Sequence, residues 1–221
     1  KAYDSLTREK SRLQAKAFFS KDAKTVIDSI YISVENLDTI AKQDSIIIIY
    51  REVYHVGKPS KEKLKEQEEW NLFVKSIINK KFLDKDFKTI DDNILNQKVL
   101  NNKPTLVNLW FTTCAPCIEE MPYLNKLKAK YGNEVNFIAI TYNNKEEVKK
   151  FLSNRDFDFT HVIDEKYFLA KKNVLQYPLN IFLDKTGIVK FVEANISLIK
   201  NEDGSISADL ASFENNIKKL L

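Results

Sequence analysis

The alternation of apolar and polar residues is most regular in the C-terminal part of the chain. Continuous apolar runs at 105–111 and 135–141 predict two buried strands. Two shorter runs, at 179–183 and 188–192, are joined by the polar tetrapeptide Asp-Lys-Thr-Gly and predict a pair of strands with a tight hairpin turn.

Apolar residues at intervals of three and four predict helices around these strands. The predicted helices span 118–131, 145–152, 165–172 and 208–221. We also expect a hairpin made of 87–90 and 98–100, and a short strand at 161–163. The resulting order, β-α-β-α-β-β-α, indicates an α/β domain over residues 85–221.

The N-terminal third, residues 1–84, is rich in lysine and carries no recognisable chemical motif. Helical spacing of apolar residues predicts a helix over 22–42, but the β-branched residues there leave a strand over 25–34 as an alternative. The isoleucine- and tyrosine-rich segment 45–56 slightly favours a strand. We therefore expect an N-terminal extension of mostly helical or mixed structure.

A break in the pattern follows at 57–60, where glycine, proline and serine are close together. Ser60 is a suitable N-cap for a further helix with a partial apolar stripe from Leu64 to Ile78. The charged run at 61–69 is then the solvated face of that helix.

Composition narrows the class of protein. Of 221 residues, 43% are hydrophobic and 30% charged, which is enough apolar material for a sizeable core. The net charge of +4 is spread along the chain and gives no reason to expect a nucleic-acid partner. The longest apolar run, at 46–50, is far shorter than the roughly 18 residues that a membrane-spanning helix needs.

Because the chain starts at Lys1, we expect that a targeting segment or tether has been removed, or that the chain was cut there for another reason.

The chain has two cysteines, Cys114 and Cys117, in one CxxC motif. This count excludes a framework of structural disulfides and a four-cysteine zinc site. His55 and His161 lie far away in other segments, so a zinc site built on this motif is disfavoured and we expect no metal. The remaining interpretations are a redox pair and two unreactive cysteines at the start of a helix.

The position of the motif favours the redox pair. The CxxC follows a predicted buried strand and begins a predicted helix, which is the arrangement of a thioredoxin-like site. At a helix N-terminus, unpaired N–H groups and the helix dipole lower the pKa of the Cys114 thiol and favour a nucleophilic thiolate. Cys117 lies one turn further on, where it can act as the resolving thiol, and Pro116 is well tolerated so early in a helix.

Two longer stretches resemble a known family. Residues 103–122, KPTLVNLWFTTCAPCIEEMP, are similar to the pattern KPxxVNFWAxWCxPCxxExP, and residues 177–189, YPLNIFLDKTGIV, to xPxxFxIDxxGxI. Residues 85–194 therefore resemble the thioredoxin superfamily, and within it the extracytoplasmic TlpA/ResA-like thiol-disulfide oxidoreductases. The resemblance implies a thioredoxin-like fold, in which a central mixed sheet is flanked by helices. It implies nothing about residues 1–84.

The resemblance also implies roles for individual residues. Pro178 falls where the family has a cis-proline facing the CxxC, which would leave the backbone of Tyr177 available to a substrate chain; a trans proline that begins a strand is the alternative.

Glu120 matches the acidic residue of a CxxCxxE pattern. A partly buried carboxyl there would relay protons and raise the thiol pKa values, whereas the alternative is an exposed glutamate in the first turns of a helix. Thr113, Ala115 and Pro116, which surround the cysteines, complete the expected substrate-binding set.

Two positions depart from the family pattern. Thr113 stands where many relatives have a tryptophan, which removes an aromatic wall beside the first cysteine. Asn108 stands where thioredoxin has a buried aspartate, although TlpA-like proteins often have asparagine, so proton handling shifts towards Glu120. We expect Trp110 and His161 to be packing residues and Glu119 to lie at the surface.

The expected reaction is thiol–disulfide exchange without a bound cofactor. Reduced Cys114 attacks a disulfide of a protein substrate, and Cys117 then resolves the mixed disulfide. The resemblance implies a reductase in the periplasm or another extracytoplasmic bacterial compartment. Such a reductase receives its electrons from a thiol donor, and a membrane-bound donor is one option.

Other functions stay open. The same fold supports disulfide oxidases, which convert dithiols of a substrate into a disulfide, and disulfide isomerases, which rearrange disulfides. A different class is a binding module whose residues 1–84 recognise a partner. A peroxiredoxin is disfavoured because Phe111 occupies the position of the threonine that its nucleophile needs.

Overall fold

The computed structural model describes residues 29–42, 45–57, 61–96, 98–100, 102–174, 176–200 and 206–221. The chain divides into two compact units, residues 1–70 and 71–221, which are described separately here.

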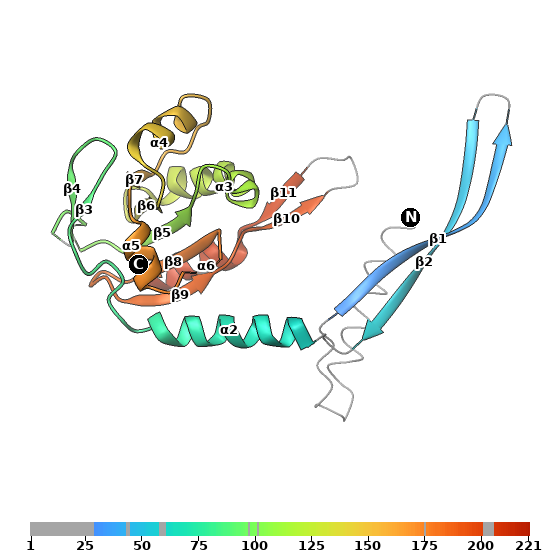
Figure 1. Cartoon of the computed structure of the whole chain (residues 1–221), viewed down its shortest axis with the longest axis horizontal. Coiled ribbons are helices and arrows are strands. Elements are labelled where there is room, and N and C mark those ends of the chain that lie inside the picture. Colours follow the sequence, from blue (N-terminus) through green and yellow to red (C-terminus); the bar gives the residue numbers. More distant parts are fainter. Residues whose placement is uncertain are drawn as a thin grey trace. The chain divides into compact units, whose positions relative to one another are not determined.

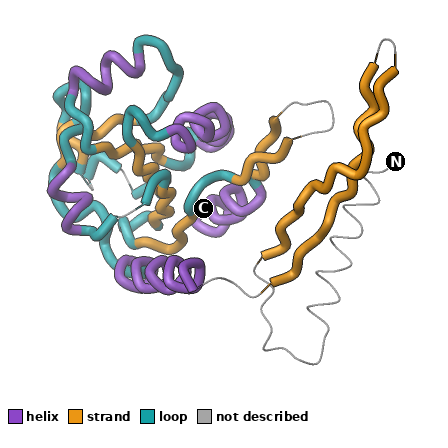
Figure 2. Tube along the Cα trace, turned by 45° about the vertical axis from the view of Figure 1, so that its right-hand side comes forward, coloured by secondary structure: helices purple, strands orange, loops and turns teal. Residues whose placement is uncertain are grey.

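The described part of the first unit is dominated by a long antiparallel hairpin. Strand β1, Ser29–Lys42, pairs with β2, Ser45–Gly57, with one register irregularity between Asn36 and Asp38 (Figure 2). The predicted helix over 22–42 is therefore wrong for residues 29–42, and the strand alternative holds for 29–34; residues 22–28 lie outside the described residues. The high content of β-branched side chains outweighs the helical spacing here. The predicted strand at 45–56 is confirmed.

Helix α2, Lys61–Ile77, confirms the helix predicted after the break at 57–60, whereas its proposed cap, Ser60, lies outside the described residues. Glu62 lies in its first turn and Lys75 in its last. Both charges are favourable to the helix dipole.

The second unit is built around a five-stranded mixed sheet with the strand order β7-β6-β5-β8-β9 (Figure 1). Strands β5, β6 and β7 are parallel, and β8 and β9 are antiparallel to their neighbours. The bounds of the strands are β5 Thr105–Trp110, β6 Asn136–Thr141, β7 Thr160–Val162, β8 Leu179–Leu183 and β9 Val189–Glu193. Every residue of β5 and β8 is buried, as the continuous apolar runs predict.

Helices flank this sheet, which confirms the predicted thioredoxin-like architecture (Figure 1). They are α3 Ala115–Tyr131, α4 Lys145–Leu152, α5 Lys166–Lys171 and α6 Ala211–Leu220. The main core joins the inner faces of α3 and α6 to one face of the sheet. Its central members are Leu106, Trp110, Leu124, Leu127, Phe182, Phe213 and Ile217.

The segment before the sheet covers both of its edges. At the β9 edge, the N–H of Asn79 donates to the carbonyl of Val189 at 2.9 Å, and the N–H of Val189 donates to the carbonyl of Lys80 at 3.0 Å. At the β7 edge, the N–H of Ile90 donates to the carbonyl of His161 at 2.9 Å. The predicted domain boundary after residue 84 stays a prediction.

The hairpin predicted from 87–90 and 98–100 is partly wrong. Strand β3, Phe87–Lys88, pairs instead with β4, Ile94–Leu95. The chain reverses earlier because Asp92 adopts a left-handed φ of 62° and the N–H of Thr89 donates to the carbonyl of Asn93 at 2.9 Å. Residues 98–100 form a turn, in which Asn96 Oδ1 accepts the N–H of Lys98 at 3.1 Å.

The predicted last helix also begins too early. Residues 206–209 form β11, Ile206–Asp209, which pairs with β10, Ser197–Lys200, as a separate hairpin. Asp209 Oδ1 accepts the N–H of Ala211 at 2.9 Å, and α6 begins at Ala211. Between these two strands, residues 201–205 lie outside the described residues.

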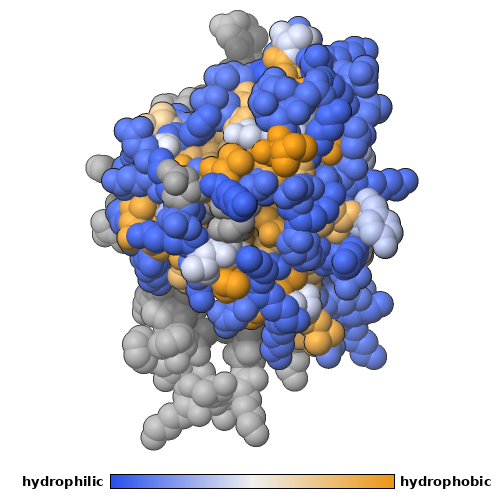
Figure 3. Space-filling view, turned by 90° about the vertical axis from the view of Figure 1, so that its left-hand side faces the viewer, coloured by the Kyte–Doolittle hydropathy of each residue, from blue (hydrophilic) through white to orange (hydrophobic). Residues whose placement is uncertain are grey.

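Figure 3 views the side of the second unit on which α4 and α5 lie; hydrophilic side chains predominate there, with smaller apolar patches between them. Within the described residues, no helix combines the length and the apolar character needed to cross a bilayer.

We predict that Leu124→Ala lowers the free energy of unfolding by about 2–5 kcal/mol, because this α3 side chain is fully buried in the main core. Urea unfolding followed by circular dichroism measures the change. Leu72→Ala is the matched control: Leu72 is 60% exposed, so its loss should change stability by no more than about 0.5 kcal/mol. Equal effects of the two substitutions would contradict this description of the core.

Candidate active site

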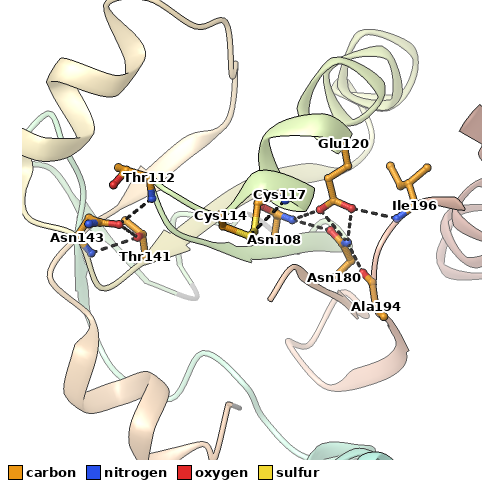
Figure 4. Close-up of a disulfide and its surroundings, with 10 residues drawn as sticks. All are labelled: Asn108, Thr112, Cys114, Cys117, Glu120, Thr141, Asn143, Asn180, Ala194 and Ile196. Atoms are coloured by element: carbon orange, nitrogen blue, oxygen red, sulfur yellow. Dashed lines mark hydrogen bonds between the residues drawn. A yellow bond between two sulfur atoms is a disulfide. The ribbon is translucent and has the colours of Figure 1, made fainter. Parts of the chain in front are cut away.

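The CxxC lies where the central strand β5 gives way to α3 (Figure 4). Cys114 is the N-cap of α3 in extended backbone conformation, and its N–H donates to the carbonyl of Phe111 at 3.1 Å. The sulfur of Cys114 accepts the N–H of Cys117 at 3.3 Å. A thiolate at this position would receive that N–H and the positive end of the helix dipole.

The two cysteines form a disulfide, with Cα atoms 5.3 Å apart. Both residues are buried, Cys114 at 3% exposure and Cys117 at 1%. Around them Thr113, Ala115 and Pro116 are exposed. The structure therefore brings the predicted CxxC residues together, in the oxidised state, behind a rim of accessible neighbours.

Pro178 comes to the same end of the sheet. Strand β8 pairs with β5 through Leu179 opposite Leu109, so Pro178 immediately precedes the strand that adjoins the CxxC-bearing strand. The peptide bond between Tyr177 and Pro178 is cis. Pro178 is buried and Tyr177 half-buried.

Glu120 lies fully inside the molecule, at 1% exposure, rather than partly buried as expected. Asn108 Nδ2 donates to its Oε1 at 2.8 Å, and the N–H of Ile196 donates to its Oε2 at 3.0 Å. Asn180 Nδ2 lies 3.2 Å from Oε1 and 3.4 Å from Oε2 (Figure 4). The alternative of an exposed glutamate is wrong, because every donor around this carboxyl is a buried amide.

The two asparagines are held in place by strand register. Asn108 and Asn180 are Cα partners in the antiparallel β5–β8 pair, so their side chains share one face of the sheet. Asn108 Nδ2 also donates to Asn180 Oδ1 at 2.9 Å, and Asn180 Nδ2 donates to the carbonyl of Ala194 at 2.8 Å. The carboxyl thus joins α3 to β5, β8 and the segment after β9.

Burial raises the pKa of Glu120 to about 7, against the opposing effect of hydrogen bonds from Ile196, Asn180 and Asn108. A carboxyl with this pKa exchanges a proton near neutral pH. It lies one helical turn from Cys117, on the inner face of α3.

A second polar cluster holds the turn before the cysteines, on the side of the disulfide opposite Glu120 (Figure 4). Asn143 Oδ1 accepts the N–H of Thr112 at 2.9 Å and the hydroxyl of Thr141 at 3.0 Å. Asn143 Nδ2 donates to Glu147 Oε2 at 3.0 Å, and Glu147 belongs to the capping box of α4. The CxxC turn is therefore anchored to the β6–α4 connection.

Trp110 and His161, expected to be packing residues, are buried, and Glu119 lies at the surface as expected. Trp110 is completely buried, and Glu119 is exposed. His161 is 5% exposed, its Nε2 lies 2.8 Å from the carbonyl oxygen of Phe157, and its ring contacts that of Trp110.

Sequence reasoning missed Asn180, Asn143 and the backbone of Ile196. A signal existed for Asn180: both fully buried strands, TLVNLW and LNIFL, contain a single asparagine in an otherwise mostly apolar run. For Asn143 the signal is its place two residues after the end of a buried parallel strand, at the edge of the sheet where loops meet. For Ile196, whose contribution is a backbone N–H, the sequence holds no signal.

Comparison with known proteins agrees with this geometry. The family model described as Redoxin matches residues 79–207, which is more than half of the chain. The chain belongs to the Redoxin family.

Individual relatives refine the assignment. The Redoxin-family chain is 28% identical over 126 residues to the thioredoxin-like protein YneN of Bacillus subtilis, across 55% of this chain and 74% of that one. It is 36% identical over 95 residues to the thiol-disulfide oxidoreductase ResA of Bacillus cereus, across 42% of this chain and 55% of that one. The structure of MTB dsbF superposes with a TM-score of 0.51 at 21% identity, covering 63% of this chain and 97% of that one, which shows the shared fold.

With its CxxC disulfide and these relatives, this Redoxin-family chain is a TlpA/ResA-like thiol-disulfide oxidoreductase of the thioredoxin superfamily. Within the described residues, no cluster of three or more His, Cys, Asp or Glu side chains is suited to hold a metal ion.

We predict that Glu120→Gln removes a pH dependence of stability in the oxidised protein. The pKa of Glu120 is about 7 in the folded state, above its ordinary value of 4.5, so its stabilising contribution is complete below pH 4.5 and is lost as pH rises through 7. The wild-type free energy of unfolding should therefore fall by about 3 kcal/mol more than that of the variant between pH 4.5 and 8. Urea unfolding at several pH values measures this difference.

Glu119→Gln is the matched control for that experiment, because Glu119 is the exposed neighbour on the same helix. It should keep the wild-type pH profile. A Glu120→Gln profile parallel to that of the wild type would show that the buried carboxyl does not titrate in this range.

Proposed function

We propose that this oxidoreductase works as a reductase of protein disulfides outside the cytoplasm. The observation that carries the proposal is the Cys114–Cys117 disulfide at the N-terminus of α3, next to the start of β8 with its cis Tyr177–Pro178 bond. This is a redox pair with an accessible rim.

The proposed cycle consists of two exchanges. In the reduced protein, the Cys114 thiolate attacks one sulfur of the substrate disulfide; a mixed disulfide forms and the other substrate sulfur leaves as a thiolate. The Cys117 thiolate then attacks the Cys114 sulfur, which forms the intramolecular disulfide and releases the substrate with two electrons more. A thiol electron donor returns these electrons by the reverse exchange, and no bound cofactor takes part.

Glu120 is proposed to handle the proton of Cys117. As a carboxylate it accepts the thiol proton when Cys117 becomes the attacking group, and it returns that proton when the disulfide is reduced. A pKa of about 7 suits both directions, and the amides of Asn108 and Asn180 support the orientation of the carboxyl.

The substrate is proposed to lie over Thr113, Ala115 and Pro116, with Tyr177 and Pro178 beside them. The exposure of the first three residues supports this, as does the pairing of β5 with β8, which brings Pro178 to the CxxC end of the sheet. Residues 1–84 are proposed to form an N-terminal extension of unknown role.

The direction of exchange and the compartment rest on the resemblance of 103–122 and 177–189 to TlpA/ResA-like proteins. We place the protein in the periplasm or another extracytoplasmic bacterial compartment, with a membrane tether before Lys1 and a membrane-bound thiol donor as one arrangement. The +4 net charge spread along the chain supports no nucleic-acid partner.

We predict that Cys117→Ser accumulates a mixed disulfide with a substrate protein, because the resolving thiol is gone while Cys114 still attacks. Incubation of the reduced variant with disulfide-bonded insulin, followed by non-reducing electrophoresis, detects the adduct. Cys114→Ser should give at least about tenfold less of it. Equal adduct from both variants would contradict the assignment of Cys114 as nucleophile, and none from either would favour a binding module.

We also predict a reduction potential near the roughly −270 mV of thioredoxin, rather than the roughly −120 mV of the oxidant DsbA. Equilibration in defined thiol/disulfide buffers, with alkylation of the free thiols, measures it. A value near that of DsbA would make the protein a donor of disulfides and overturn the proposed direction.

A further inference from the structure

Three aromatic side chains meet at the CxxC end of the sheet, and each comes from a different connection. Phe111 follows β5, Tyr142 follows β6, and Tyr177 precedes the cis bond before β8. The ring centroids of Phe111 and Tyr142 are 5.4 Å apart in a stacked arrangement. The Tyr177 ring lies edge-on, 5.3 Å from Phe111 and 6.2 Å from Tyr142. These three residues are called the aromatic triad below.

The aromatic triad is connected to the reacting cysteine through the backbone. The carbonyl of Phe111 accepts the N–H of Cys114 at 3.1 Å, so this ring belongs to the turn that carries the nucleophile. Asn143, directly after Tyr142, accepts the N–H of Thr112 at 2.9 Å. These two hydrogen bonds therefore hold the backbone of Phe111 and the residue after Tyr142 to the turn that carries Cys114.

The triad is only partly covered by the protein itself. Tyr142 is 38% exposed, and Phe111 and Tyr177 are half-buried, although large aromatic side chains are usually well buried. Preorganised, partly exposed aromatic rings are the groups that most often supply binding energy at protein interfaces. A charged residue lies beside these rings. The pKa of the Tyr142 hydroxyl is raised mainly by burial and, to a smaller extent, by the negative charge of Glu147.

We propose that the aromatic triad selects substrates with an apolar side chain next to the cysteine that Cys114 attacks. The occupant is a segment of the substrate polypeptide, because the triad is continuous with the turn that carries Cys114. The residue before Cys114, Thr113, has no aromatic ring. The aromatic triad supplies aromatic surface instead, from the segments after β5, after β6 and before β8. This inference rests on the proposed exchange with protein disulfides.

The test compares two peptide disulfides that differ at one position. Each is the symmetric disulfide of a short blocked peptide, with phenylalanine in one case and serine in the other beside its cysteine. The reduced full-length protein reacts with each, and acid-quenched samples separated by chromatography give the second-order rate constants. The wild type should react about fivefold faster with the phenylalanine peptide, the scale of one favourable aromatic contact.

Tyr142→Ala should bring the ratio of the two rate constants close to one, whereas Tyr142→Phe, which keeps the ring, should retain the preference. Tyr167→Ala is the matched control: Tyr167 is a tyrosine on α5 with 82% exposure, and its loss should leave the wild-type ratio. A wild-type ratio near one, or an unchanged ratio in Tyr142→Ala, would overturn the proposal.

The ratio separates recognition from a general loss of reactivity, because a misfolded or less reactive Cys114 slows both peptides equally. Hydroxyethyl disulfide, which has no side chains to recognise, provides a third rate constant. If the wild type reacts with hydroxyethyl disulfide but does not discriminate between the peptides, the triad proposal alone fails. If it reacts with none of the three, the proposed exchange fails as well.

Discussion

The burial of one carboxyl group determines how the elements of this domain meet. Glu120 is almost completely removed from solvent, and an ionised carboxyl without partners would cost several kcal/mol there. Three amide donors offset this cost by hydrogen bonds to the carboxyl. They are the side chains of Asn108 in β5 and Asn180 in β8, and the N–H of Ile196 after β9. The redox helix, two central strands and the segment that leads to the β10–β11 hairpin must therefore keep one relative arrangement to satisfy a single group.

In the proposed cycle, this arrangement couples electron transfer to proton transfer. The carboxyl lies one turn from Cys117, and its pKa of about 7 means that modest changes in nearby charge alter its protonation. Reduction of the disulfide creates thiols that can ionise beside it. Asn108 Nδ2 also donates to Asn180 Oδ1, and Asn180 Nδ2 also donates to the carbonyl of Ala194, so each amide has a second partner besides the carboxyl. Both amides therefore keep a hydrogen-bond partner when the charge of the carboxyl changes.

The sequence predicted the redox centre and the α/β core well because both depend on local patterns. The CxxC after TLVNLW, the helix begun by Cys114 and the hairpin turn at 184–187 are each encoded within a few residues. Asn180 could be paired with Asn108 only once the β5–β8 register was known. The β10–β11 hairpin was missed, and a strand was kept only as an alternative over 25–34, because backbone partners rather than local spacing decide the conformation of these segments.

The segment that leads into the domain closes both borders of the central sheet. Residues 79–82 pair with β9 and with the turn before it, and residues 88–90 bond to β7, so neither outer strand presents a free row of amides and carbonyls along these residues. Along these residues the outer strands are protected from joining another sheet edge to edge. A substrate polypeptide therefore cannot pair with the sheet at these residues. In the proposed function, the substrate therefore lies at the loop end of the sheet, beside Cys114.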